Sequence, residues 1–258
     1  MTTYTSSLLG RPAAAALVLV AGLMVSMSAQ SGGATANKLT DAEKKAGWTL
    51  LFDGKSLDGW RGYKQPDASA TRWRVEDGFL TVVQNDGKDT RGARDIITKE
   101  TYDRFDLTFE WKIAEAGNSG LKYYVLEDEP AAIGHEYQLI DDERHADAKI
   151  GPHRQTAALY DVLVASNRKL EPAGKFNSSR IVANGKTVEH WLNGVKVLQY
   201  ELDSTALRAA IAKSKFKDIA RFGKLQKGHI LLQDHGDRVW YRNIKIRPLP
   251  ATTTTAAR

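Results

Sequence analysis

Apolar and polar residues alternate along most of the chain with the two-residue period of a β-strand. The clearest run is Phe105–Ile113, which has an apolar residue at every odd position. Further runs of strand character fall at 48–52, 73–75, 79–83, 121–126, 136–140, 180–183, 187–192, 195–200, 229–232 and 239–246. Many short strands at near-regular spacing predict an all-β domain built as a sandwich.

Turn residues between these runs indicate which strands pair. Asn184-Gly185 and Asn193-Gly194 separate three consecutive runs, and Asp77-Gly78 separates two others. Asn-Gly and Asp-Gly are the strongest short signals of a β-hairpin, so we expect a three-stranded meander and a separate hairpin. One short helix is predicted near 204–215, with Ser204 as its N-cap and an apolar stripe through Leu207 and Ile211.

The segment 134–142 has the most informative polar face. Glu136 and Gln138 point to one side of its strand, Tyr137 and Leu139 point to the other, and the segment ends in acidic residues. A carboxylate and an amide on one face can supply acid–base and hydrogen-bonding groups to a sugar. An ordinary half-buried strand with a solvated polar face is the competing interpretation.

Residues 1–36 have the features of a secretory signal peptide. Arg11 supplies the positive end, 13–25 the apolar stretch, and Ala34-Thr35-Ala36 a cleavage site. An apolar run of about 13 residues is too short to span a bilayer as a helix. We therefore expect an exported protein, periplasmic or secreted, without a membrane segment in the mature chain. It should have a lead-in at 37–46, one domain at 47–249 and a disordered tail at 250–258.

Composition excludes several classes of function. The chain has no cysteine, so disulfides, thiolate metal sites, a catalytic thiol and a lipid-modified cysteine are all excluded. Its formal net charge is +6, but the basic residues are scattered, and only 213–217 forms a cluster. Scattered charge argues against nucleic acid as a partner. The oligomeric state is left open.

Several segments, in order, resemble the 3-keto-disaccharide hydrolase family. They are 51–60 (LFDGKSLDGW), 117–121 (GNSGL), 136–141 (EYQLID), 189–194 (EHWLNG), 233–236 (QDHG) and 242–247 (RNIKIR). The resemblance covers about 47–249. It implies a concanavalin A-like jelly roll of two curved antiparallel sheets with a sugar site on the concave face. It also implies a carbohydrate substrate, a glycoside or disaccharide whose C3 hydroxyl has been oxidised to a ketone.

Cleavage of such a sugar by elimination needs a base, a group that stabilises an enolate oxygen, and an acid for the leaving oxygen. His235 suits proton transfer because an ordinary imidazole titrates near neutral pH. Glu136 or Asp141 could take the opposite role. The substrate-contacting residues expected beside them are Gln138, Lys122, Tyr124, Gln233, Trp191 and Arg242.

Three alternatives stay open. Glu136, Gln138 and Asp141 have the spacing of the E-x-D-x-x-E motif of retaining β-glucanases, which hydrolyse with two carboxylates. A non-catalytic lectin would need amides and aromatic rings but no proton transfer. No cofactor is certain, but His135, His145 and His153 lie near several carboxylates, so a divalent metal ion is a further possibility.

Overall fold

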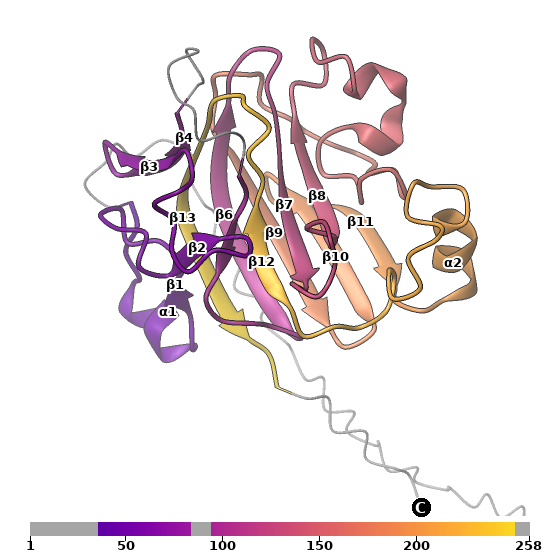
Figure 1. Cartoon of the computed structure of the whole chain (residues 1–258), viewed down its shortest axis with the longest axis horizontal. Coiled ribbons are helices and arrows are strands. Elements are labelled where there is room, and N and C mark those ends of the chain that lie inside the picture. The colour runs from indigo at the N-terminus through magenta and orange to yellow at the C-terminus, as the bar shows by residue number, and fades with distance from the viewer. Residues whose placement is uncertain (1–35, 84–93, 251–258) are drawn as a thin grey trace, which may run out of the picture.

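The computed structural model of the chain describes residues 36–83 and 94–250. Residues 1–35 of the predicted signal peptide and 251–258 of the predicted tail lie outside the described residues. The described chain forms two antiparallel sheets stacked face to face (Figure 1), a concanavalin A-like jelly-roll sandwich as the sequence predicts. No helix among the described residues is long and apolar enough to cross a membrane.

The larger sheet has eight strands in the order β11-β10-β9-β6-β13-β4-β3, with β1 also pairing with β13, and the smaller has five in the order β2-β5-β12-β7-β8. The elements are α1 (Asp41–Lys45), β1 (Thr49–Leu50), β2 (Trp60–Gly62), β3 (Trp73–Glu76), β4 (Phe79–Val82), β5 (Ile96–Thr98), β6 (Phe105–Ile113), β7 (Asn118–Val125), β8 (His135–Ile140), the 3-10 helices η1 (Ala148–Ile150) and η2 (Pro152–Arg154), β9 (Asn177–Asn184), β10 (Thr187–Leu192), β11 (Val195–Glu201), α2 (Thr205–Ile211), β12 (His229–Leu232) and β13 (Val239–Pro248).

The predicted hairpins are confirmed. β3 pairs with β4 across a turn in which Asp77 and Gly78 both have positive φ, and β9, β10 and β11 form the expected meander. At the second turn of this meander Asn193 and Gly194 also have positive φ. Positive φ at both central residues gives a turn whose twist matches that of the strands, and asparagine, aspartate and glycine adopt it at low cost.

The helix predicted near 204–215 is shorter than expected. α2 is capped by Ser204, whose hydroxyl accepts from the Leu207 amide at 3.1 Å, but it ends at Ile211. There the Ser214 hydroxyl donates to the Ile211 carbonyl at 2.8 Å, which offers the backbone an alternative to another helical turn. The lysine-rich segment that follows is therefore an irregular turn packed against the sandwich.

The core lies between the sheets and contains a buried polar network among its apolar side chains. The Tyr200 hydroxyl lies 2.5 Å from the Tyr123 hydroxyl and 2.8 Å from Nδ1 of His135. The Tyr123 hydroxyl is also 2.8 Å from Nε2 of His190. All four side chains are buried, and burial lowers the pKa of His135 to about 3 and that of His190 to about 4. Both imidazoles are neutral at physiological pH.

The outer edge of β8 is extended by a segment that is not itself a regular strand. The Ala157 amide donates to the Gln138 carbonyl at 2.9 Å, and the Tyr160 amide donates to the Glu136 carbonyl at 3.0 Å. Tyr137 and Leu159 form a bridge between the two segments. Tyr160 therefore shares the outward face of the five-stranded sheet with Glu136.

Candidate active site

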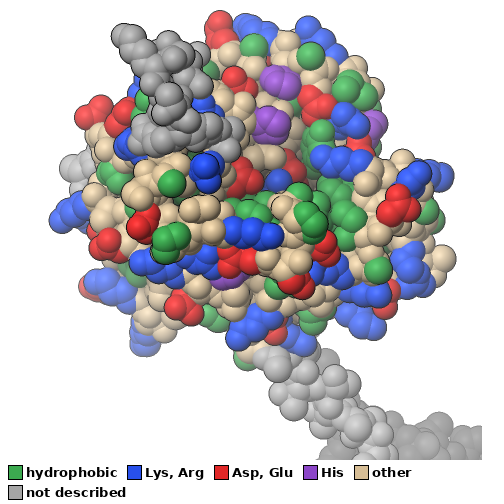
Figure 2. Space-filling model, viewed as in Figure 1, with side chains coloured by type: hydrophobic (Ala, Val, Ile, Leu, Met, Phe, Trp, Pro, Cys, Tyr) green, Lys and Arg blue, Asp and Glu red, His purple; other side chains and the backbone are tan. Residues whose placement is uncertain are grey.

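Strand register brings polar residues into two rows on the outward face of the five-stranded sheet. In one row Glu136 on β8 faces Lys122 on β7. In the next row Gln138 on β8 faces Gly120 on β7, and the Gln233 amide, just beyond β12, donates to the Gly120 carbonyl at 2.9 Å. Tyr137 and Leu139 point into the core, as the alternation predicts. The hollow near the middle of this face contains acidic and basic side chains together (Figure 2).

Glu136 is the central ionisable group of this surface. Its carboxyl lies over Gly120, where an added Cβ would stand 2.4 Å from Oε1. Oε2 lies 3.9 Å from Nζ of Lys122. The residue is only 5% exposed. Burial raises its pKa, and the charges of Lys122, Lys215 and His235 oppose that rise. Glu136 is therefore a desolvated carboxyl beside cations, which suits it to proton transfer near neutral pH.

The Gln138 amide lies within hydrogen-bond distance of the Glu136 carboxyl. With the amide nitrogen turned toward Glu136, it donates to Oε1 at 3.0 Å and to the Ser119 carbonyl at 3.1 Å. With the amide oxygen turned there instead, it can accept a hydrogen bond from a protonated Glu136, because an amide has both a donor and an acceptor. Gln138 can thus hold the carboxyl in either state.

Lys215 reaches this face from the turn after α2. Its Nζ lies 4.2 Å from the centre of the Tyr160 ring and 5.0 Å from that of Phe216, and its amide donates to Asp161 Oδ2 at 2.8 Å. Desolvation lowers its pKa while the charge of Glu136 opposes the fall. The sequence pattern indicates only a cluster of basic residues at 213–217. The apolar Phe216 between two lysines was the one signal that this segment packs inward.

His235 is exposed, in the segment between β12 and β13, and its charge acts on Glu136. Its neighbour Asp234 forms a buried ion pair with Arg72, whose Nε and Nη2 donate at 3.0 Å and 2.6 Å. Asp234 also accepts from the Gly236 amide at 2.9 Å. This ion pair fixes the turn that carries His235. Nothing in the local sequence around Arg72 pointed to it, because the partners are 162 positions apart.

Asp141 is not brought to Glu136. It follows the last residue of β8, about 16 Å along the strand from Glu136. Its carboxylate accepts from the amides of Ala116, Glu143 and Arg144 at 2.8 Å, 3.1 Å and 3.2 Å, and from the Arg144 guanidinium at 3.3 Å. Burial acts in the opposite direction, but these bonds lower its pKa on balance. Asp141 closes a turn, and its acceptor capacity is used there.

Three expected substrate-contacting residues also lie elsewhere. Tyr124, with φ of 61°, departs from the alternation of β7 and turns into the core, where its hydroxyl donates to the Asp103 carbonyl at 3.2 Å. Trp191 and Arg242 are on the eight-stranded sheet, bonded to neighbouring glutamates. Their neighbours along each strand point into the core, so both face outward on the opposite side of the sandwich.

The histidines considered for a metal are dispersed. His135 lies in the core, with Nε2 accepting from the Gly223 amide at 3.0 Å. His145 accepts from the Asp147 amide at 3.1 Å, and His153 lies 3.7 Å from Asp161. Within 36–83 and 94–250, no group of three or more His, Cys, Asp or Glu side chains is placed to hold a metal ion.

A separate hollow of about 320 Å³ lies beyond the end of β8. Its lining includes Trp111, Asp141, Arg144, Leu170 and Asn177, but not Glu136. Because the buried carboxylate of this hollow, Asp141, already accepts hydrogen bonds that close a turn, we place the candidate active site at Glu136.

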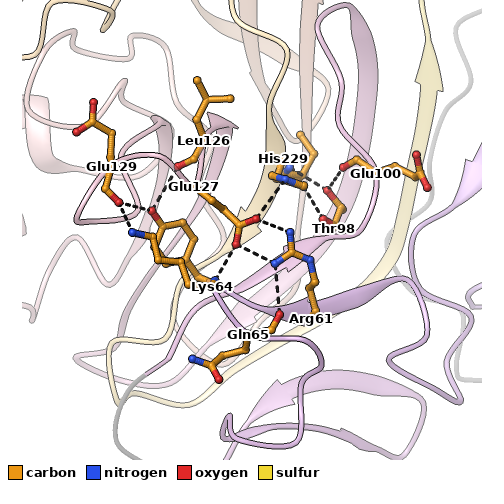
Figure 3. A network of polar contacts seen from close by, with 11 residues as sticks. Arg61, Lys64, Gln65, Thr98, Glu100, Leu126, Glu127, Glu129 and His229 are labelled. Atoms are coloured by element: carbon orange, nitrogen blue, oxygen red, sulfur yellow. Dashed lines mark hydrogen bonds and ion pairs between the residues drawn. The ribbon is translucent and has the colours of Figure 1, made fainter.

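One side of the candidate site is bounded by the loop between β7 and β8, which is fixed by a polar network (Figure 3). Arg61 on β2 donates to both oxygens of Glu127 at 2.8 Å and 2.5 Å, and the Lys64 amide donates to Oε1 at 2.8 Å. The Arg61 bonds lower the pKa of Glu127 to about 2. His229 lies 3.9 Å from the same carboxylate. A bidentate pair of this kind holds the loop in one geometry beside the site.

Fold and site together define a jelly-roll protein with acid–base groups on the outward face of one sheet. Residues 47–247 match the model of the 3-keto-alpha-glucoside-1,2-lyase-like domain, and the chain belongs to that family. A protein of Bacteroides thetaiotaomicron named 3-keto-disaccharide hydrolase is 32% identical, over 91% of this chain and 97% of its own.

Two solved structures from Parabacteroides distasonis, both described as candidate glycosyl hydrolases, share the architecture. One is 33% identical with a TM-score of 0.75, covering 83% of this chain and 100% of its own. The other is 27% identical with a TM-score of 0.60, covering 78% and 99%.

Proposed function

We propose that this protein is an exported glycoside hydrolase that acts on 3-keto-glycosides, cleaving them by elimination followed by addition of water. The observation that carries the proposal is the buried carboxyl of Glu136 beside Lys122 and within the field of Lys215. The names of the family and of its curated relative support the substrate class. The signal-peptide pattern at 1–36 supports export.

The chemistry follows from the ketone. The proton on C2 of a 3-keto sugar is acidic because its removal gives an enolate that spreads charge onto the C3 oxygen. Collapse of the enolate forms the C1–C2 double bond and expels the C1 substituent. Water then adds its oxygen to C1 and a proton to C2, so the net reaction is hydrolysis.

The residues take roles that match this sequence. Glu136 as carboxylate removes the C2 proton. Lys122 and Lys215 stabilise the negative charge on the C3 oxygen, an interaction that strengthens as the enolate forms. Gln138 and Gln233 bind sugar hydroxyls. His235 is the group that the sequence favours for protonating the leaving oxygen.

Direct hydrolysis by two carboxylates has less support. A retaining mechanism needs two carboxyl groups about 5–5.5 Å apart. The residue that faces the same way as Glu136 on β8 is Gln138, which cannot act as a nucleophile or an acid, and Asp141 closes a distant turn. A lectin needs no proton transfer, so it would not need a desolvated carboxyl beside Lys122.

The test is incubation of the purified protein with a 3-keto-β-glucoside and with its unoxidised parent in D₂O. We expect cleavage of the keto sugar alone, with deuterium at C2 of the product. Glu136→Gln should lower kcat by about 10²–10⁴-fold. Cleavage of the unoxidised parent would overturn the elimination mechanism, and binding of either sugar without cleavage would favour the lectin.

A further inference from the structure

Asp95 is an ionisable residue of the candidate site that the sequence did not single out. It immediately precedes β5, and because Ile96 packs into the core, Asp95 points to the outward face. Its Oδ1 accepts from the Asp234 amide at 2.9 Å. The turn that carries His235 therefore also holds Asp95 in place.

The surroundings of Asp95 are those of an active-site acid. Burial raises its pKa, and the negative charge of Asp234 adds to that rise. Lys122 and His235 are the cations that act on it in the opposite direction. The charge of Asp95 in turn contributes to the raised pKa of Glu136, so the two carboxyls occupy one electrostatic environment. When two carboxyls interact in this way, one can hold a proton while the other is ionised, so the pair can supply an acid and a base.

Gln233 lies between the two carboxyls and has an unmet hydrogen bond. β12 lies between β7 and β5 in the sheet, so Gln233, just beyond β12, lies between Gly120 on one side and Asp95 on the other. Its Oε1 is buried, and none of the described residues donates to it. A buried acceptor without a donor is costly, and a sugar hydroxyl bound here would satisfy it.

The spacing of the strands leaves room for a sugar ring. The Glu136 carboxyl lies over Gly120 on β7, and Asp95 immediately precedes β5, two strands away. Two inter-strand steps amount to about 10 Å between the backbone columns. Side chains that lean inward from the two columns can reach opposite sides of one pyranose ring.

We propose that Asp95, rather than His235, is the acid that protonates the leaving oxygen, working across the sugar from Glu136. The inference rests on the proposed function. In the elimination, Glu136 takes the C2 proton, the C1–O bond breaks, and the Asp95 proton goes to the departing oxygen. In the second stage the oxygen of a water molecule adds to C1 and Asp95 takes a proton from that water, while Glu136, whose proton has exchanged with solvent, gives a proton to C2. Both residues regain their starting states.

The test compares leaving groups of different basicity. An alkyl 3-keto-glucoside needs a proton on its departing oxygen, whereas a 4-nitrophenyl 3-keto-glucoside leaves readily as an anion. For Asp95→Asn we expect kcat on the alkyl substrate to fall about 10²–10³-fold and kcat on the nitrophenyl substrate to fall less than about tenfold. Asparagine keeps the oxygen that accepts from the Asp234 amide, and retained nitrophenyl cleavage shows that the variant is folded.

Two comparisons complete the experiment. Asp141→Asn removes a carboxyl outside the site and should leave both rates near the wild type. His235→Gln should lower the two rates by the same factor. A selective loss of alkyl cleavage in His235→Gln, with none in Asp95→Asn, would overturn the inference and leave the proposed function standing. Failure of the wild type to cleave either keto sugar would instead overturn the proposed function and the role of Asp95 with it.

Discussion

The carboxyl of Glu136 occupies the space that a side chain at position 120 would fill. Residue 120 faces Gln138 across the β7–β8 pair, and without a Cβ there Glu136 can lie flat across the sheet toward Gln233. The glycine is thus part of the geometry of the site, even though it carries no chemical group.

Gly120→Ala should therefore impair catalysis far more than stability. The added methyl would stand 2.4 Å from Oε1 and 3.0 Å from the carboxyl carbon, so Glu136 must rotate away. We expect kcat/KM to fall at least about 100-fold, as misplacement of a reacting group by about 1 Å does. Gly62→Ala is the control, because its Cβ would meet the Gln65 side chain at 3.0 Å on the same sheet. Equal losses in the two variants would contradict this account.

Asp141→Asn should impair stability more than catalysis. Asparagine replaces one acceptor oxygen with a donor that faces backbone amides and Arg144. We expect the free energy of unfolding to fall by about 1–3 kcal/mol, with kcat within about threefold of the wild type. Urea denaturation and steady-state kinetics measure the two quantities. A loss of activity comparable with that of Glu136→Gln would restore Asp141 as a catalytic candidate.

The effects of substituting Arg72 and Asp234, which form a buried ion pair, on the free energy of unfolding should be strongly coupled. Arg72→Met leaves a buried, uncompensated carboxylate, and we expect it to lower the free energy of unfolding by about 3–5 kcal/mol. The double variant Arg72→Met/Asp234→Leu should lose less than the sum of the single changes. Additive losses in urea denaturation would show that the pair does not act as a unit.

The two core histidines predict sensitivity to acid. The pKa values of His135 and His190 are about 3 and about 4 in the folded protein, below the ordinary 6.5, so the unfolded chain binds more protons between those values. Above pH 6.5 their full contribution to the free energy of unfolding is present. As pH falls from 6.5 toward 4, the free energy of unfolding decreases by about 1 kcal/mol per pH unit for each histidine.

Urea unfolding at pH 7, 6 and 5 measures this loss. The stability of His190→Gln should fall less steeply with decreasing pH than that of the wild type. Identical slopes in the two proteins would show that the buried imidazole of His190 does not carry the acid sensitivity.

Much of the fold could be predicted because it depends on local patterns. The strand at 105–113 and the turns at 77–78 and 193–194 follow from side-chain period and from residues that tolerate positive φ. The outward placement of Glu136 and Gln138 follows from the same alternation. Tyr124 breaks that alternation, and its positive φ has no signal in the neighbouring residues.

The site was harder to predict because it depends on which strands become neighbours. Asp95 comes next to Asp234 only because β5 pairs with β12, and Lys215 reaches the sheet only because α2 ends early. The pairing of β5 with β12 has no local sequence signal, and Phe216 is the one local sign that the segment of Lys215 packs inward. Arg242 and Trp191 looked equally suitable as ligand contacts, but the order of strands places them on the far sheet.

The segment that extends β8 also affects how molecules behave toward one another. A bare edge strand offers unpaired amides and carbonyls to any other chain and so promotes aggregation by strand addition. Here the amides of Ala157 and Tyr160 donate hydrogen bonds to the carbonyls of Gln138 and Glu136. The Thr156 hydroxyl donates to the carbonyl of Ile140. A protein without disulfides is thus protected from self-association at the edge of the sheet that carries Glu136.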